Sequence, residues 1–360
     1  MGNTYLITGY PGFIASRIVK EIIQTEHVDH LYLLVLPDMK ERAKAAAESL
    51  LLFENQVTIV EGDITKRDYG WTRELSHNLK RSVTHVFHLA AIYDLAVKKK
   101  QAEAVNVDGT RNVNRWTEGV KQLKRYVYFS TAYVSGDRRG TILERELVRG
   151  QSFKNHYEKT KYDAEVLVEE VSKTTPTTII RPGIVRGDSV TGETAKFDGV
   201  YFYLNILERF RQLRLPRVPL VASSEAKGNF VPVDYVVRAA VYLGHKDVGA
   251  GKTYHLTDPN PFSMREVFHM LSEAYLVKTP KAGIASKLAG NRLSKPLEKY
   301  FRVEKEALAY AAVDADYDTE QAERDLQGSG IVCTPFDETV GALVHYYYEH
   351  KNDKDKHIQR

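Results

Sequence analysis

The first 185 residues alternate between short apolar runs with strand character and amphipathic segments with a helical period. This alternation is typical of a parallel sheet covered by helices on both faces, because each parallel strand is reached through a crossover helix. With right-handed crossovers, the sequence predicts an α/β fold with a doubly wound parallel sheet. After residue 185 the alternation loosens, which predicts a smaller C-terminal lobe.

A glycine turn joins the first predicted strand to the first predicted helix. Residues 4–8 form the apolar strand, Gly9 and Gly12 make the turn, and residues 13–25 carry a helical apolar period. The glycines let the backbone approach a pyrophosphate, and the helix N-terminus offers unpaired N–H groups. Ala15 takes the third glycine position, where only close helix–strand packing is needed. A turn of this kind also occurs without a ligand, so the downstream motifs decide its meaning.

The remaining elements follow from the same patterns. Further strands are predicted at residues 30–36, 56–60, 83–89, 125–129 and 177–180, with shorter ones at 229–233 and 252–256. Further helices are predicted at residues 39–52, 98–121, 157–172, 200–215, 235–243, 263–276, 281–312 and 339–350. Ser263 is placed to cap the helix that follows it.

These elements suggest a division of the chain. Residues 1–185 are expected to form a dinucleotide-binding and catalytic Rossmann-type domain. Residues 186–350 are expected to form a mixed substrate-binding lobe, of which about 229–260 returns to the Rossmann core. Residues 351–360 read as a charged tail.

Composition narrows the function classes. A formal net charge of +4 over 360 residues gives no basis for nucleic-acid binding. No apolar run reaches the roughly 18 residues that a membrane span requires. The chain enters a strand almost at once, so no signal peptide is expected. The single cysteine, Cys333, fits a reducing cytosol and is more simply a packed thiol than a nucleophile. We therefore expect a cytoplasmic protein.

Ligands of doubly wound sheets bind at the carboxyl ends of the strands. Asp63, after the third strand, can accept from an adenine amino group while Ile64 packs on the ring, although Asp63 is equally well placed as a turn residue. Ala90 and Ala91 leave room for a flat ligand after the fourth strand. Thr131 brings a hydroxyl to the floor of the cleft after the fifth.

Tyr157 and Lys161 lie four residues apart at the start of a predicted helix, and therefore on one face. An ammonium close to a phenol favours the phenolate, so we expect Lys161 to lower the pKa of Tyr157 below its usual value. Thr131 can orient the same substrate oxygen. A Tyr-x-x-x-Lys spacing is common by chance in this tyrosine-rich chain, but its order after the other motifs is specific.

Together these stretches resemble the short-chain dehydrogenase/reductase superfamily, extended type. The resemblance runs from residue 4 to about 260 and is carried by residues 8–15, 62–64, 88–91, 106–110, 130–134, 157–161, 181–183 and 231–234. Within the superfamily, residues 130–134 and 187–193 look most like the thioester-reductase and fatty-acyl-CoA-reductase (male sterility-like) branch.

The resemblance implies roles for individual residues. It implies Thr131, Tyr157 and Lys161 as the catalytic triad, and Asn106 as the helix residue whose backbone supports a proton-relay water. Lys161 would also hold the nicotinamide ribose. The implied cofactor contacts are Gly9, Gly12, Phe13, Ile14, Asp63, Ile64, Ala90, Ala91, Tyr157, Lys161, Pro182 and Gly183.

One position departs from the family branch. Leu36 ends the second strand where the branch usually has an arginine for the 2′-phosphate of NADP, and no acidic residue stands there to hold a ribose diol. Lys40 and Arg42 can supply the phosphate contact, or they can be solvated helix residues. NADP(H) is therefore favoured, with NAD(H) possible.

The stretch 196–230 is expected to wall the cleft, with aromatic residues beside arginines. Aromatic and arginine side chains suit an acyl chain carried on coenzyme A or a phosphopantetheine arm. The alternative is a helix with a core face and a solvated basic face. The predicted substrate-binding residues are Tyr93, Tyr133, Phe197, Tyr201, Arg211 and Arg214, with Arg209 and Arg217 nearby.

Three functions compete. The first is an NAD(P)H-dependent oxidoreductase that reduces an acyl thioester or a carbonyl, with Tyr157 as general acid. The second is a nucleotide-sugar epimerase or dehydratase with tightly bound NAD, whose substrate diphosphate could use the same arginines. The third is a non-enzymatic cofactor-sensing protein, which the Tyr157–Lys161 pair disfavours. A homodimer is expected, as in extended relatives, through helices near 98–121 and 157–172. Fold analogy alone does not choose the substrate.

Overall fold

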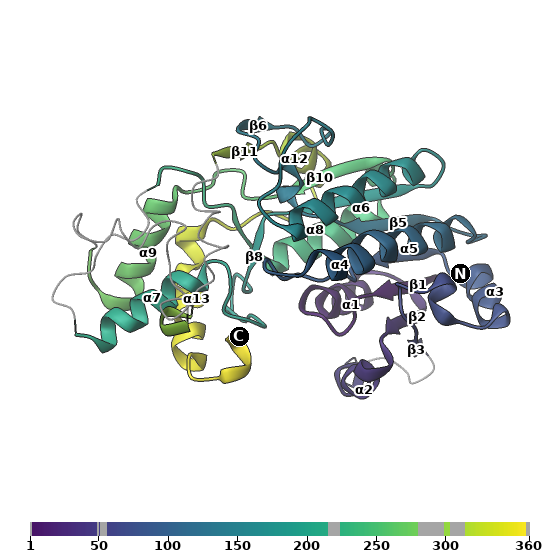
Figure 1. Cartoon of the computed structure of the whole chain (residues 1–360), viewed down its shortest axis with the longest axis horizontal. Coiled ribbons are helices and arrows are strands. Elements are labelled where there is room, and N and C mark those ends of the chain that lie inside the picture. The colour runs from purple at the N-terminus through teal and green to yellow at the C-terminus, as the bar shows by residue number, and fades with distance from the viewer. Residues whose placement is uncertain are drawn as a thin grey trace.

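A seven-stranded sheet, parallel throughout, forms the larger part of the molecule in the computed structural model (Figure 1). The structure describes residues 2–48, 50, 56–214, 224–279, 299–302 and 314–357. The strand order is β10-β7-β5-β4-β1-β2-β3. The strands are β1 (Asn3–Thr8), β2 (Val28–Val35), β3 (Val57–Glu61), β4 (His85–His88), β5 (Arg125–Phe129), β7 (Thr177–Pro182) and β10 (Lys252–Leu256). The predicted doubly wound parallel sheet is confirmed.

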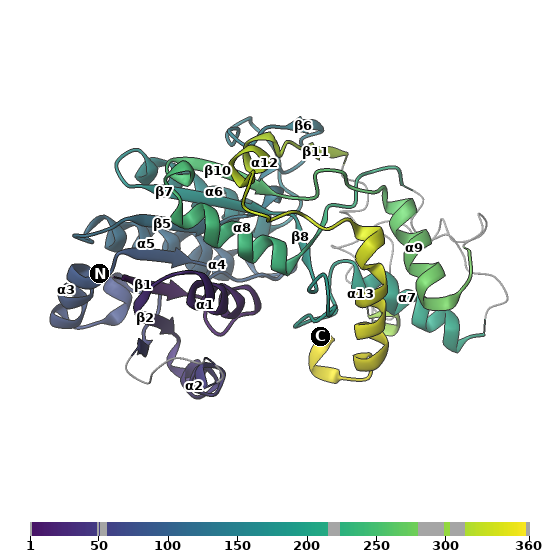
Figure 2. The same ribbon diagram turned by 180° about the vertical axis from the view of Figure 1, so that it is seen from behind.

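Helices cover both faces of this sheet (Figures 1 and 2). One face packs against α1 (Phe13–Thr25), α8 (Val233–His245) and α12 (Glu320–Leu326). The other packs against α3 (Arg73–Ser82), α5 (Gly109–Glu118) and α6 (His156–Ser172). In α1, the buried residues Ala15, Ile18, Val19 and Ile22 recur at helical spacing, which explains why this segment forms a helix against the sheet. Helix α2 (Lys40–Glu48) lies beside the edge strand β3.

The predicted helix at 98–121 is divided into three parts. Helix α4 (Lys99–Ala102) leads into a π-helical turn (Glu103–Asp108), which leads into α5. Insertions of this kind are frequent at functional sites. Gly109, the first residue of α5, lets this helix approach Ile64 closely, because a Cβ at Gly109 would lie 2.7 Å from Ile64 Cδ1.

A second apolar core lies in the C-terminal lobe, which Figure 2 shows beside the main sheet. Helices α7 (Tyr201–Gln212), α9 (Met264–Leu276) and α13 (Phe336–His350) contribute most of its side chains. The short parallel strands β8 (Ile184–Arg186) and β9 (Phe230–Pro232) join the lobe to the Rossmann core. The predicted cap of α9 is confirmed, because Ser263 and Glu266 form a reciprocal capping box.

The sequence did not predict several elements, most of which are short. Besides α3, β8 and α12, these are β6 (Gly140–Ile142) and β11 (Ala315–Tyr317), which pair with each other. Most of the helix predicted at 281–312 lies outside the described residues, as do residues 51–55 of the chain. Among the described helices, none is both long enough and apolar enough to cross a membrane.

Candidate active site

The glycine turn between β1 and α1 forms a close backbone cradle. Gly9 has φ +90°, and a Cβ there would lie 2.8 Å from the backbone nitrogen of Ala90. A Cβ at Gly12 would lie 2.6 Å from Gly9 O. No side chain in the described chain caps α1, so its first N–H groups remain open to an anion. Phe13 and Ile14 begin the helix and pack partly against the core. This cradle fits the pyrophosphate of a dinucleotide.

Asp63 and Ile64 follow β3, as the sequence predicted, but both already have structural contacts. Asp63 Oδ1 accepts hydrogen bonds from the backbone nitrogen and the hydroxyl of Thr65, at 2.9 and 2.8 Å, which is the turn role that the sequence left open. Ile64 is buried against Gly109. Any adenine contact would therefore use the edge of this turn.

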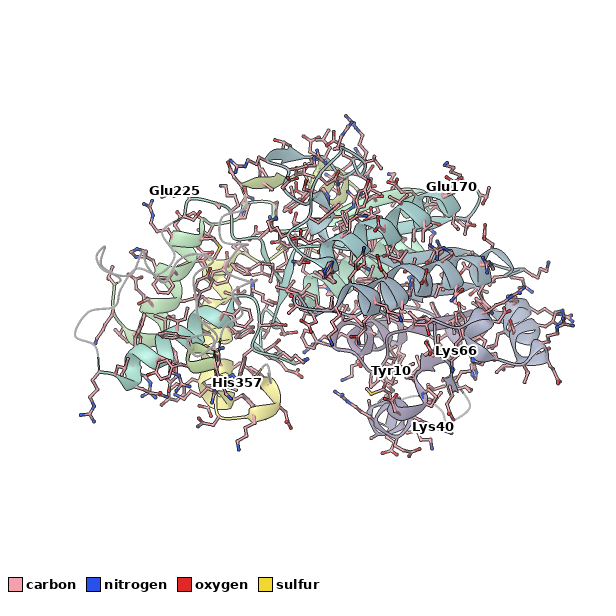
Figure 3. All side chains as sticks on the ribbon, in the orientation of Figure 1. Tyr10, Lys40, Lys66, Glu170, Glu225 and His357 are labelled. Atoms are coloured by element: carbon pink, nitrogen blue, oxygen red, sulfur yellow. The ribbon has the colours of Figure 1, made fainter. Side chains whose placement is uncertain are left out.

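The predicted 2′-phosphate residues lie on α2. Leu36, at the end of β2, is exposed. Lys40 Nζ donates to Glu61 Oε1 at 2.5 Å, so this lysine has a carboxylate partner on β3. Arg42 is exposed on the same helix. Figure 3 shows Lys40 at the outer edge of the molecule formed by α2.

A directional chain of hydrogen bonds connects the end of β1 to the π-helical turn. Thr8 Oγ1 accepts two backbone N–H groups, one of them from Ala90 at 3.1 Å, and contacts His88 Nδ1 at 2.8 Å. Thr110 Oγ1 donates to Asn106 O at 2.6 Å and contacts His88 Nε2 at 3.1 Å. The Thr110 hydroxyl donates its one proton to Asn106 O, so towards His88 it can only accept. His88 Nε2 therefore carries a hydrogen and donates it to Thr110 Oγ1. Burial lowers the pKa of His88 to about 3, so the ring stays neutral.

Asn106 lies in the π-helical turn with its amide fully engaged. Its Oδ1 accepts the backbone N–H of Ile92 at 2.8 Å, and its Nδ2 donates to Ile92 O at 3.3 Å and to Thr160 Oγ1 at 3.0 Å. Asn106 therefore joins the loop after β4 to helix α6. The expected role of its backbone in holding a proton-relay water stays a prediction.

The ends of β4 and β7 lie at the same carboxyl edge of the sheet. Ala90 is partly exposed and Ala91 is exposed, which leaves open space after β4. Pro182 ends β7, and Gly183 follows it with its N–H bonded to Leu256 O at 3.1 Å. A Cβ on Gly183 would lie 2.7 Å from Asn229 O, so this position requires glycine.

The structure brings Thr131, Tyr157 and Lys161 together between β5 and α6. Tyr157 is in the first turn of α6, which Asn155 caps by accepting the Glu158 N–H at 2.9 Å. The Tyr157 hydroxyl hydrogen-bonds to Thr131, which follows β5. Lys161 lies one turn further along and is buried.

The pKa values differ from the prediction. Burial raises the pKa of Tyr157 above its usual value, and the Thr131 hydrogen bond opposes this only in part. Burial lowers the pKa of Lys161 to about 7, although the charge of Glu165 opposes this. Lys161 Nζ donates to Phe129 O at 2.6 Å and to Tyr128 Oη at 3.0 Å. The expected lowering of the Tyr157 pKa was therefore wrong, because desolvation outweighs the Thr131 hydrogen bond that opposes it.

Two predicted substrate residues from the first domain lie near this centre. Tyr93 is 57% exposed, and its ring meets Tyr157 edge to face at 5.1 Å. Tyr133 is buried and packs edge to face on Tyr317 at 6.1 Å, so its ring belongs to the wall behind the site. Its backbone N–H donates to Thr131 Oγ1 at 3.3 Å.

The predicted substrate residues of α7 lie elsewhere. Phe197 and Tyr201 are fully buried in the core of the lobe, and Tyr201 Oη accepts the Gly187 N–H at 3.2 Å. Arg211 pairs through two nitrogens with Glu208, at 2.7 and 2.8 Å, and Arg214 is exposed after the helix. The helix therefore has the core face and basic face of the alternative interpretation, which corrects the placement of these residues at a cleft. Arg217 lies outside the described residues.

Sequence reasoning missed two side chains around Lys161. Tyr128 holds the ammonium from β5, and Glu165 lies one turn beyond Lys161 on α6. The spacing of four residues from Lys161 to Glu165 is a signal that could have identified the second. Nothing in the alternation of β5 marks Tyr128, because a buried tyrosine in a central strand is ordinary.

Comparisons with known proteins identify the family of this chain. Residues 7–240 match the family described as male sterility protein, an NAD-binding family. Fatty acyl-CoA reductase wat of Drosophila melanogaster is 26% identical over 273 residues, covering 65% of this chain and 52% of that protein. This chain spans between 22% and 52% of the full length of three curated relatives that it matches.

Solved structures agree as well. The terminal R domain from the myxalamid PKS-NRPS biosynthetic pathway superposes with a TM-score of 0.81 at 25% identity, covering 99% of this chain and 93% of that one. A thiolation–reductase di-domain from an archaeal non-ribosomal peptide synthetase has the same fold, with a TM-score of 0.73 at 21% identity. It is covered over 76% of its length, and 97% of this chain is matched. With its family model spanning the glycine turn, the strand ends and the Tyr157–Lys161 pair, the chain belongs to the male sterility protein family of NAD-binding proteins.

Proposed function

We propose that the protein is an NAD(P)H-dependent reductase that reduces the carbonyl of an acyl thioester or an aldehyde. The observation that carries the proposal is the position of the Tyr157 hydroxyl. It is bonded to Thr131 at the carboxyl edge of a parallel sheet, with Lys161 one helical turn behind it. A nicotinamide dinucleotide, when bound, supplies the hydride.

Each side chain of the site has its own role in the proposed reaction. Tyr157 donates its proton to the substrate oxygen, and its raised pKa keeps that proton in place until charge develops there. Thr131 orients the same oxygen. Lys161 supplies positive charge, and Phe129 O and Tyr128 fix its position. The cradle at Gly9 and Gly12 would hold the pyrophosphate.

Replacing the acid tests this assignment. Tyr157→Phe removes the proton donor while keeping the ring that meets Tyr93, so we expect turnover to fall by about 10²–10⁴-fold. The measurement is steady-state oxidation of NADPH with the best substrate. Tyr203→Phe is the matched control, because Tyr203 is buried in the core of the C-terminal lobe, where its ring packs against Phe268 at 5.9 Å. Turnover in Tyr157→Phe within about threefold of the control would rule out the acid role.

The substrate class rests on the relatives and on the open side of the site. Tyr93 presents an exposed aromatic ring beside Tyr157, which suits an acyl group entering from solvent. The R-domain likeness and the thiolation–reductase likeness support an acyl group held on a thiol carrier, such as coenzyme A or a phosphopantetheine arm. Hydride addition to a thioester and loss of the thiol would give an aldehyde.

An assay panel decides between the enzyme classes. Acyl-CoA thioesters, acyl-phosphopantetheine thioesters, long-chain aldehydes and nucleotide sugars are each supplied with NADPH or NADH. We expect NAD(P)H oxidation with release of free thiol from a thioester, because the hydride and the leaving thiol are stoichiometric. Turnover of nucleotide sugars alone, without net cofactor consumption, would replace the proposal with an epimerase.

For the cofactor we propose NADP(H) over NAD(H), supported by Lys40 and Arg42 at the start of α2. Arg42→Ala removes one charge near the expected 2′-phosphate, so NADPH should bind about tenfold more weakly while NADH changes little. The measurement is fluorescence titration of both cofactors. Lys44→Ala is the control, because Lys44 lies on the same helix and pairs with Glu41 at 2.9 Å. Equal affinity of the unaltered protein for NADH and NADPH would contradict the preference.

We also propose a homodimer in which the contact is formed by α6 and by the helical segment from α4 to α5 that contains the π-helical turn. Three apolar residues of these helices are buried against the sheet: Val113, Ala164 and Val168. Three others stay partly exposed and support the contact: Ala104, Val107 and Leu167. Light scattering at tens of micromolar should give twice the monomer mass, and Leu167→Glu should restore the monomer. A monomer in the unaltered protein would exclude this assembly.

A further inference from the structure

A buried ion pair lies directly behind the catalytic side chains. Arg181, the penultimate residue of strand β7, and Glu165 on α6 are both almost completely excluded from solvent. Arg181 Nε and Nη2 donate to Glu165 Oε1 at 2.8 and 2.5 Å. The other carboxylate oxygen accepts the hydroxyl of Ser130. One carboxylate therefore holds a guanidinium from one strand and a hydroxyl from another.

The guanidinium is fixed on its other side as well. Arg181 Nη1 donates to Glu144 O and Glu146 O, each at 3.0 Å, and lies 3.2 Å from His255 Nε2. Two buried charges pay a large desolvation cost, so such a pair adds little stability over apolar side chains of similar volume. Its value to the protein must then lie in what it positions or in the field it produces.

The pair connects the two elements that carry the catalytic groups. Tyr157, Lys161 and Glu165 follow one another at intervals of four on α6, and therefore share one helix face. Ser130 directly precedes Thr131 at the end of β5. The Ser130–Glu165 bond therefore sets the distance between the strand end that carries Thr131 and the helix that carries Tyr157.

The charge of Glu165 also affects the pKa of Lys161. The titratable groups around Lys161 come from three elements: His88 on β4, Tyr128 on β5, and Tyr157 and Glu165 on α6. Burial lowers the pKa of His88 to about 3 and raises the pKa of both tyrosines, so these three are neutral near pH 7. Within this described group, Glu165 is the anion. Burial alone would lower the Lys161 pKa further, and Glu165 opposes it.

We propose that Glu165 is a positioning residue of the active site, clamped by Arg181 and Ser130, which fixes helix α6 against the end of β5 and places a negative charge one helical turn from Lys161 on the same helix face. The inference rests on the proposed reductase function. It adds that the Lys161 charge depends on a carboxylate that touches neither substrate nor cofactor.

The test measures the titration of Lys161 directly. Protein labelled with [ε-¹³C]lysine is followed by NMR across pH, and the Lys161 signal is identified by its loss in Lys161→Met. In Glu165→Gln the Lys161 pKa should fall by about one pH unit or more from its value of about 7. The basic limb of the kcat/KM profile should move to lower pH by the same amount, because Lys161 loses its charge earlier.

Two further variants show whether a change in the Lys161 pKa comes from the lost charge or from a disturbed structure. Glu165→Gln leaves Arg181 buried without its anion, and that unpaired cation would itself lower the Lys161 pKa. Glu165→Gln/Arg181→Met removes both charges, so the Lys161 pKa should still fall, but by less than in Glu165→Gln. Asp325→Asn is the matched control, because Asp325 is a buried carboxylate that accepts from Lys252 Nζ at 2.6 Å and from Tyr254 Oη at 2.7 Å at the edge strand β10. Its Lys161 titration should equal that of the unaltered protein.

The outcomes separate the two proposals. An unchanged Lys161 titration in a folded neutral variant overturns the role of Glu165, and so does failure of both neutral variants to fold. The NMR titration needs no turnover. Absence of activity in the unaltered protein with every substrate would therefore count against the reductase proposal and leave the Lys161 result to be judged on its own.

Discussion

Every strand of the main sheet runs in the same direction, and the site depends on this parallel pairing. Because the carboxyl ends of the strands meet at one edge, residues far apart in the sequence become neighbours there. The glycine turn follows β1, Thr131 follows β5, and Gly183 follows β7. Helix α6 then brings Tyr157 and Lys161 to that edge from outside the sheet. The chemistry is thus assembled by topology, while each strand contributes only one or two side chains.

Burial is the dominant electrostatic effect at this edge. It raises the pKa of Tyr157 and lowers the pKa of Lys161, so both groups favour their neutral forms more than they would in water. A phenol that keeps its proton is suited to donate it when negative charge develops on a substrate oxygen. The Thr131 hydrogen bond and the Glu165 carboxylate act against this desolvation.

The C-terminal lobe uses its aromatic side chains to form its own core. Phe197 and Tyr201 are buried among α7, α9 and α13, where packing them removes a large apolar area from water. The carboxylate of Glu208 is likewise used within the lobe, since it binds Arg211 and Tyr275. The arginines and aromatics of α7 therefore serve first to build the lobe. Among the predicted aromatic residues, Tyr93 is the exposed one, and it follows β4 of the main sheet.

The sequence by itself determined the alternation of strands and helices, the glycine turn and the order of the motifs at the strand ends. These follow from local periodicity and from glycine's freedom at positive φ, which need no knowledge of distant contacts. It also placed Tyr157 and Lys161 on one helix face, because helical spacing is local. Only the tertiary structure decided the π-helical turn at Asn106, the burial of Tyr201 and the ion pair between Glu165 and Arg181. Each of these depends on which segments pack together, and desolvation, which sets the pKa of Tyr157, exists only once they do.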